Sequence, residues 1–106
     1  MTYKVVITKF AQSQIESYVD YILKTFKSNQ AAKDLISDFK DTVKSLSFLA
    51  GSLTLLDDSE LRKRSIRKIN LKKHRYLILY RIVNNVVSVE AVYHVLQDYN
   101  NIFTNR

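Results

Sequence analysis

The sequence predicts an α+β fold in which a strand and a helical hairpin are followed by antiparallel strands. Three observations predict it: two long stretches carry apolar residues at three- and four-residue steps, short β-branched stretches lie before and after them, and an Asn-Asn pair separates two of the later stretches. We expect two helices packed on one face of a twisted sheet of about four strands. The 106 residues suffice for one domain with a single modest core, spanning residues 1–106.

The first half of the chain is typical of one strand and two helices. Residues 3–8 (YKVVIT) are short and β-branched, which favours a strand. Each helix then has one apolar stripe, formed by Ile15, Tyr18, Val19, Ile22, Leu23 and Phe26 in the first and by Leu35, Ile36, Phe39, Val43 and Leu46 in the second. Ser28 and Asn29 can end one helix and cap the next, and Gly51 suits a helix C-terminal cap. Two long helices joined by so few residues form an antiparallel hairpin.

The second half is typical of three strands. Residues 65–71 alternate enough to form one, and residues 76–83 and 86–96 flank Asn84 and Asn85, which tolerate a two-residue hairpin turn. This turn sets the register. On one face of the ribbon the expected pairs are Ile82 with Val87, Tyr80 with Val89, Ile78 with Ala91 and Tyr76 with Tyr93. On the other face they are Arg81 with Ser88, Leu79 with Glu90, Leu77 with Val92 and Arg75 with His94.

The two faces of this ribbon differ in polarity. The first is nearly all apolar and should pack on the helices, in a core of Ile15, Val19, Ile22, Leu35, Phe39, Val43, Ile78 and Tyr80. The second carries the charges and should face solvent. We therefore expect Arg75 and His94 to meet on the open face at one end of the sheet.

Composition excludes several classes of function. The chain has no cysteine, so disulfides, thiolate metal sites and a cysteine nucleophile are impossible. The acidic residues are scattered and form no ligand cluster, so we expect no metal and no cofactor. No stretch approaches the roughly 20 apolar residues of a membrane span, and the N-terminus is unlike a signal peptide. A cytoplasmic protein is expected.

Charge is distributed unevenly along the chain. The net charge is +7, and all of it comes from the second half, where residues 62–75 (RKRSIRKINLKKHR) contain no carboxylate. Such asymmetry indicates an anionic partner, either nucleic acid or an acidic protein segment. The alternative is a solvated basic face that only maintains solubility.

Three stretches resemble the RelE/ParE superfamily of bacterial toxins. They are YKVVITKFAQSQIESYVDYI, SIRKINLKKHRYLILYRI and VEAVYHVLQDYNNIF, and the resemblance extends over essentially the whole chain. It implies a toxin of a type II toxin–antitoxin module that is partnered by a cognate antitoxin. Members of the superfamily act in two unrelated ways: some cleave messenger RNA on the ribosome, and others poison DNA gyrase.

The resemblance also identifies candidate catalytic residues. Lys68 and Tyr99 lie near catalytic positions of the ribonuclease branch, and Arg75 and His94 are close enough in the expected strands to substitute for its missing residues. That chemistry requires a base, an acid and cations on the developing phosphorane charge, without a metal. The remaining members of the basic run would bind RNA or a protein partner; they are Arg62, Lys63, Arg64, Arg67, Lys72, Lys73 and His74.

Two departures from the ribonuclease branch keep the mechanism open. Leu77 stands where that branch usually has an arginine, and the tail from His94 to Tyr99 lacks its arginine pair. The basic run, the two histidines and Tyr99 favour mRNA cleavage, which is our leading interpretation. The long helical hairpin and the missing arginines favour a gyrase poison that is not an enzyme. A third possibility is a degenerate toxin that only binds its antitoxin.

Overall fold

The computed structural model describes residues 2–53 and 55–106 and confirms the expected α+β fold. Its elements, in chain order, are β1 (Lys4–Ile7), α1 (Lys9–Phe26), α2 (Asn29–Leu49), a 3₁₀ turn (Ala50–Ser52), α3 (Ser59–Lys63), β2 (Arg67–Asn70), β3 (Tyr76–Val83), β4 (Val86–His94) and α4 (Tyr99–Thr104). The strands form one sheet in the order β1-β4-β3-β2. β1 runs parallel to β4, and the other neighbours are antiparallel. No helix in the described part is long and apolar enough to cross a membrane.

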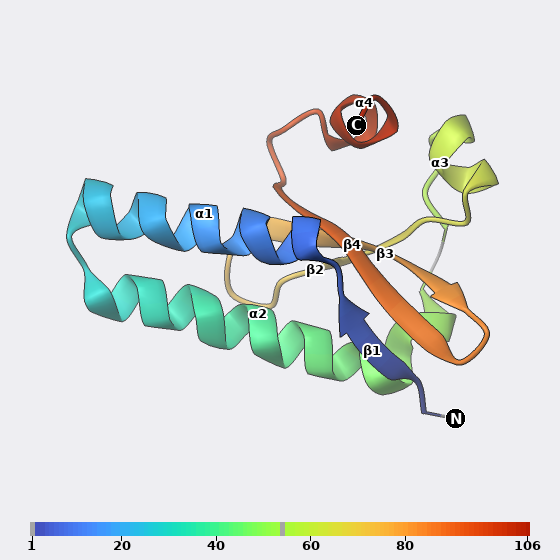
Figure 1. Cartoon of the computed structure of the whole chain (residues 1–106), viewed down its shortest axis with the longest axis horizontal. Helices are drawn as coiled ribbons and strands as arrows, with labels where there is room; N and C mark the ends of the chain where they lie inside the picture. Colours follow the sequence, from blue (N-terminus) through green and yellow to red (C-terminus); the bar gives the residue numbers. More distant parts are fainter. Residues whose placement is uncertain (1, 54) are drawn as a thin grey trace.

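The helical hairpin forms as the two stripes predict, and α1 and α2 lie side by side (Figure 1). Each helix begins at a hydroxyl cap, where Thr8 accepts a hydrogen bond from the amide of Ala11 at 3.1 Å and Ser28 from that of Ala31 at 3.0 Å. The C-terminal cap expected at Gly51 is wrong, because α2 ends at Leu49 and Gly51 lies in the 3₁₀ turn without a positive φ. A Cβ atom at Gly51 would lie 2.5 Å from the hydroxyl of Tyr3, so the end of the Tyr3 side chain would have to move to admit a larger residue.

A β-bulge changes five of the eight expected pairs between β3 and β4. The pairs next to the Asn84–Asn85 turn form as expected, as far as Tyr80 opposite Val89. Beyond them Glu90 is an extra residue on β4, so the register moves by one. The expected partners of Ile78, Tyr76, Leu79, Leu77 and Arg75 are therefore wrong. The actual pairs are Leu79 with Ala91, Ile78 with Val92, Leu77 with Tyr93 and Tyr76 with His94.

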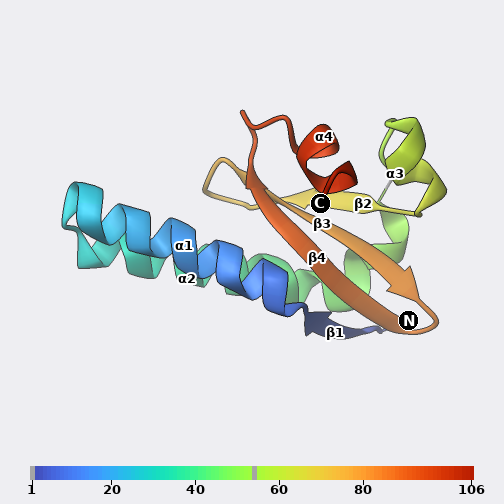
Figure 2. The same cartoon turned by 45° about the horizontal axis from the view of Figure 1, so that its top comes forward.

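Both faces of the sheet are covered. Ile78 and Tyr80 are buried against the helical hairpin with Ile15, Leu35 and Phe39, as expected, and the partly buried Val19, Ile22 and Val43 pack against this core. The opposite face was expected to be open and charged. Instead it carries a second apolar cluster, formed by Leu56, Leu61, Ile66, Leu77, Leu79, Ala91, Tyr93 and Phe103. Figure 2 shows α3 and α4 on this side of the sheet and the helical hairpin on the other.

Candidate functional site

The basic run is spread along one edge of the sheet. β2 is an edge strand, and the run begins in α3, continues through β2 and ends in the loop between β2 and β3. Arg62, Lys63 and Arg64 therefore lie at one end of the strand and residues 72–75 at the other. The run does not form a single patch.

Acidic residues accompany the α3 end of the run. Glu60 forms an ion pair with Arg64 at 3.1 Å, although both side chains are nearly half exposed and the pair adds little stability. Arg67 is partly buried and donates a hydrogen bond to the carbonyl of Leu53. Asp57 and Asp58 line a pocket together with Lys68. At this end carboxylates lie among the cations, so the positive charge is less concentrated than the sequence of the run alone suggests.

Lys68 and Tyr99 are brought together, as the resemblance implies. The Nζ atom of Lys68 lies 3.4 Å from the hydroxyl of Tyr99, at an exposed position. Both residues line a pocket of about 420 Å³, whose other lining residues are Leu53, Leu55, Leu56, Asp57, Asp58 and Asn100. Two carboxylates in this pocket would repel a phosphate group, so the pair lacks the surroundings of an RNA cleavage site.

His94 lies on the other face of the sheet. Because of the bulge, its neighbour across the strands is Tyr76, and the two ring centroids are 5.1 Å apart. Tyr76 in turn contacts Tyr18 of α1 at 4.8 Å, so this cluster faces the helical hairpin. Lys68 pairs with Leu79 and shares its face, which is the face covered by α3 and α4. The expected convergence of Lys68, Arg75 and His94 is therefore wrong.

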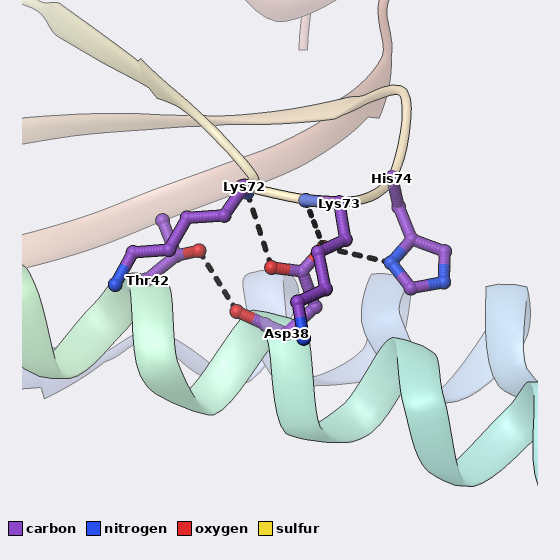
Figure 3. A network of polar contacts seen from close by, with 5 residues as sticks. All are labelled: Asp38, Thr42, Lys72, Lys73 and His74. Atoms are coloured by element: carbon purple, nitrogen blue, oxygen red, sulfur yellow. Dashed lines mark hydrogen bonds and ion pairs between the residues drawn. The ribbon is translucent and has the colours of Figure 1, made fainter.

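Asp38 organises the other end of the basic run. Its side chain is 1% exposed in the middle of α2 and accepts hydrogen bonds from the loop between β2 and β3 (Figure 3). The amide of Lys72 donates to Oδ1 at 3.1 Å, and the amide of Lys73 donates to Oδ2 at 2.8 Å. Nδ1 of His74 lies 2.7 Å from Oδ2 and must carry the hydrogen, because an ionised carboxylate only accepts.

These hydrogen bonds keep the carboxylate ionised. Burial alone would raise the pKa of Asp38, but the hydrogen bonds from His74 and from the amides of Lys73 and Lys72 outweigh it and lower the pKa below its ordinary value. A buried charge is tolerated only when it is compensated in this way. Asp38 was not among the residues predicted from the sequence, although a carboxylate one turn after Leu35 on the apolar side of a helix was a visible signal.

An apolar groove runs between the two long helices. It has a volume of about 410 Å³, and its lining is mostly apolar, formed by Ile7, Ile15, Val19, Leu23, Ile36 and Phe39 with Gln12, Glu16, Asp20 and Lys40. On α2, Lys33, Lys40 and Lys44 follow at steps of seven and four residues and so share one side of the helix. Of these lysines, Lys40 lines the groove and Lys33 lines a neighbouring depression, whereas Glu16 and Asp20 line the groove on the α1 side.

The structure offers no evident metal site in residues 2–53 and 55–106, where no group of three or more candidate ligands comes together.

Comparisons with known proteins give one family and one fold. A family model described as the ParE toxin of the type II toxin–antitoxin system parDE matches residues 5–99. Among solved structures, the chain is similar to one described as the chromosomal ParDE TA system from P. aeruginosa, with a TM-score of 0.74 and 14% identity. The similarity covers 89% of this chain and 97% of that one. No curated protein matches the chain.

Proposed function

Because the chain belongs to the ParE toxin family of type II toxin–antitoxin systems, we propose that it inhibits growth by poisoning DNA gyrase. The supporting observation is that a buried leucine, Leu77, occupies the position where the ribonuclease branch usually has an arginine. Leu77 is 2% exposed and lies in the apolar cluster beneath α3 and α4. No transition-state cation could act from such a position.

The remaining candidates for RNA cleavage are dispersed. His94 could act as acid or base near neutral pH, but it lies on the opposite face of the sheet from Lys68 and Tyr99. RNA cleavage requires a base, an acid and a cation around one phosphate. This separation supports gyrase poisoning over mRNA cleavage, although mRNA cleavage was the leading interpretation of the sequence. Under this proposal the toxin is a single domain and acts in the cytoplasm, where gyrase is located.

We expect the purified protein to convert supercoiled plasmid into linear DNA when gyrase and ATP are present. Lys68→Ala and His94→Gln should remain as active as the parent, because neither side chain belongs to a shared catalytic site in this structure. Primer extension on messages from cells that express the toxin should show no new cleavage ends. New ends within codons, together with intact plasmid in the gyrase assay, would establish the ribonuclease mechanism instead.

The partner in this family of systems is a cognate antitoxin, and we propose that an amphipathic antitoxin helix occupies the groove between α1 and α2. The groove offers an apolar floor at helical spacing, which is the surface that binds the apolar face of a partner helix. Lys40, which lines the groove on α2, and Lys33 beside it favour acidic residues along one flank of that helix. The net charge of +7 favours an acidic partner as well.

Leu23→Asp should leave the protein toxic but prevent its neutralisation by the antitoxin encoded beside it. The side chain of Leu23 lines the groove and is 36% exposed, so a carboxylate there blocks an apolar contact without disturbing the core. The measurement is growth of cells that express each toxin variant with and without the antitoxin. Phe48→Asp is the matched control, because Phe48 is 58% exposed and lies outside the groove. Normal neutralisation of Leu23→Asp would place the antitoxin elsewhere.

A further inference from the structure

The loop between β2 and β3 is held more firmly than an exposed hairpin loop requires. Three donors of residues 72–74 converge on the single carboxylate of Asp38. Thr42, one turn further along α2, donates its hydroxyl hydrogen to the carbonyl of Asp38 at 2.8 Å. Loops of this kind are usually among the most mobile parts of a domain. Here the backbone of the loop is fixed to the middle of a long helix.

The same loop carries three cations whose charge is not neutralised by ion pairs. Lys72, Lys73 and Arg75 are exposed, and within the described residues none of them forms an ion pair. The carboxylate of Asp38 accepts hydrogen bonds from two backbone amides and from His74, and it forms no ion pair with the lysine side chains of the loop. The result is a rigid backbone that presents three free cations.

We propose that residues 72–75 form a phosphate-contacting loop that binds the backbone of the DNA held by gyrase, with Asp38 and His74 as positioning residues. This inference rests on the proposed function. Lys72, Lys73 and Arg75 are the contacting groups. Asp38 and His74 do not contact the DNA; they hold the loop in one conformation, so that its cations are already positioned when the DNA binds.

The spacing of the cations favours DNA over an acidic protein. Three cations within four residues require a dense row of negative charges, and duplex DNA presents about one phosphate charge per 1.7 Å of its axis. The groove proposed for the antitoxin lies on the opposite flank of α2, because Ile36 and Asp38 are separated by about 200° around the helix. Asp34 and Asp41 line a depression with Lys73 and His74. These carboxylates exclude an anion from the depression itself, so a phosphate can approach Lys73 only from the solvent-exposed side of the loop, where Lys72 and Arg75 are also exposed.

The first test is the salt dependence of binding to a 30-base-pair duplex, measured by fluorescence anisotropy without gyrase. Each phosphate contact contributes about 0.9 to the slope of log affinity against log salt concentration. The triple variant Lys72→Ala, Lys73→Ala, Arg75→Ala should therefore have a slope smaller by about 2.7. The matched control is Lys33→Ala, Lys40→Ala, Lys44→Ala, which removes the same charge from the other side of α2 and should retain most of the slope. Equal slopes for the two triple variants would overturn the proposal.

The second test separates positioning from charge. Asp38→Asn removes a negative charge, so general electrostatics predicts tighter DNA binding, whereas loss of the hydrogen-bonded loop predicts weaker binding. We expect Asp38→Asn to bind DNA more weakly and to have a smaller slope of log affinity against log salt concentration. His74→Gln should change both quantities in the same direction. Asp41→Asn makes the same charge change on the same helix and should bind slightly more tightly. Circular dichroism confirms folding. If Asp38→Asn does not fold, His74→Gln and the loop triple variant decide the outcome, and unchanged DNA binding by both would overturn the proposal.

The gyrase assay distinguishes this inference from the proposed function. If the protein linearises plasmid with gyrase but the loop triple variant does so equally well, the loop proposal fails and the gyrase function stands. If the loop triple variant binds DNA normally but binds the antitoxin or gyrase more weakly, the loop contacts a protein and the DNA proposal is overturned. Reduced DNA affinity together with reduced plasmid cleavage supports both.

Discussion

Replacement of Asp38 by alanine should lower the free energy of unfolding by about 1.5–3 kcal/mol, because it removes the charged acceptor of three partly buried hydrogen bonds. Two backbone amides and Nδ1 of His74 would lose their acceptor, and each of these partly buried donors would need a water molecule as its new partner. Urea denaturation of parent and variant at pH 7 measures the difference. Asp41→Ala is a suitable control, since Asp41 is exposed on the same helix. A difference below about 1 kcal/mol would mean that the loop is not held by this carboxylate.

The same experiment at low pH checks that the charge of Asp38 is responsible. The pKa of Asp38 is lower in the folded chain than its ordinary value, so the unfolded chain takes up the proton first as pH falls. The stabilisation that ionised Asp38 provides is therefore fully present above the pKa of Asp38 in the unfolded chain, which is about 3.9. It is lost as the pH falls through the lower pKa of Asp38 in the folded chain. The stability difference between the parent and Asp38→Ala should narrow below about pH 4. A difference that stays constant down to pH 2 would assign the effect to packing.

Leu77→Arg should also destabilise the protein by about 3–5 kcal/mol and should not create ribonuclease activity. The substitution restores the residue type of the ribonuclease branch, but it places a cation in the apolar cluster between the sheet and α4. Leu77 is 2% exposed, so the charged guanidinium would have to be desolvated or displace the residues that cover this face.

Chemical denaturation and limited proteolysis of the C-terminal helix would detect this change. Leu77→Met is the control, because a swap of similar volume in a core usually costs less than 1.5 kcal/mol. A folded Leu77→Arg protein that cleaves messenger RNA would show that this face can still accommodate the ribonuclease site.

The fold could be predicted because its signals are local. The two helical stripes and the turn at Asn84 and Asn85 each depend on residues close together in the chain, and the register is correct where the turn alone determines it. The bulge could not be predicted, because Ala91, Val92 and Tyr93 are all apolar and can face either cluster. Periodicity alone does not choose between two buried faces.

The candidate site was less predictable, because it depends on contacts between distant residues. The donors to Asp38 come from a loop 34 to 36 residues further along the chain, and no local pattern specifies them. Charge counted along the sequence was misleading for the same reason. The cations of α3 are close to Glu60, Asp57 and Asp58 in space, although a count from Arg62 onward leaves these carboxylates out.

The extra residue at Glu90 has a consequence for how relatives of this chain are compared. Before it, odd-numbered residues of β4 such as Val87 and Val89 face the helical hairpin; after it, even-numbered residues such as Val92 do. An ungapped alignment to a homologue without the bulge would therefore match residues from opposite faces over the last four residues of the strand. In such a homologue, the residue aligned with His94 would lie on the same side as Lys68. A single insertion or deletion at this position could thus separate or reunite two candidate functional groups during evolution while leaving every strand and helix in place.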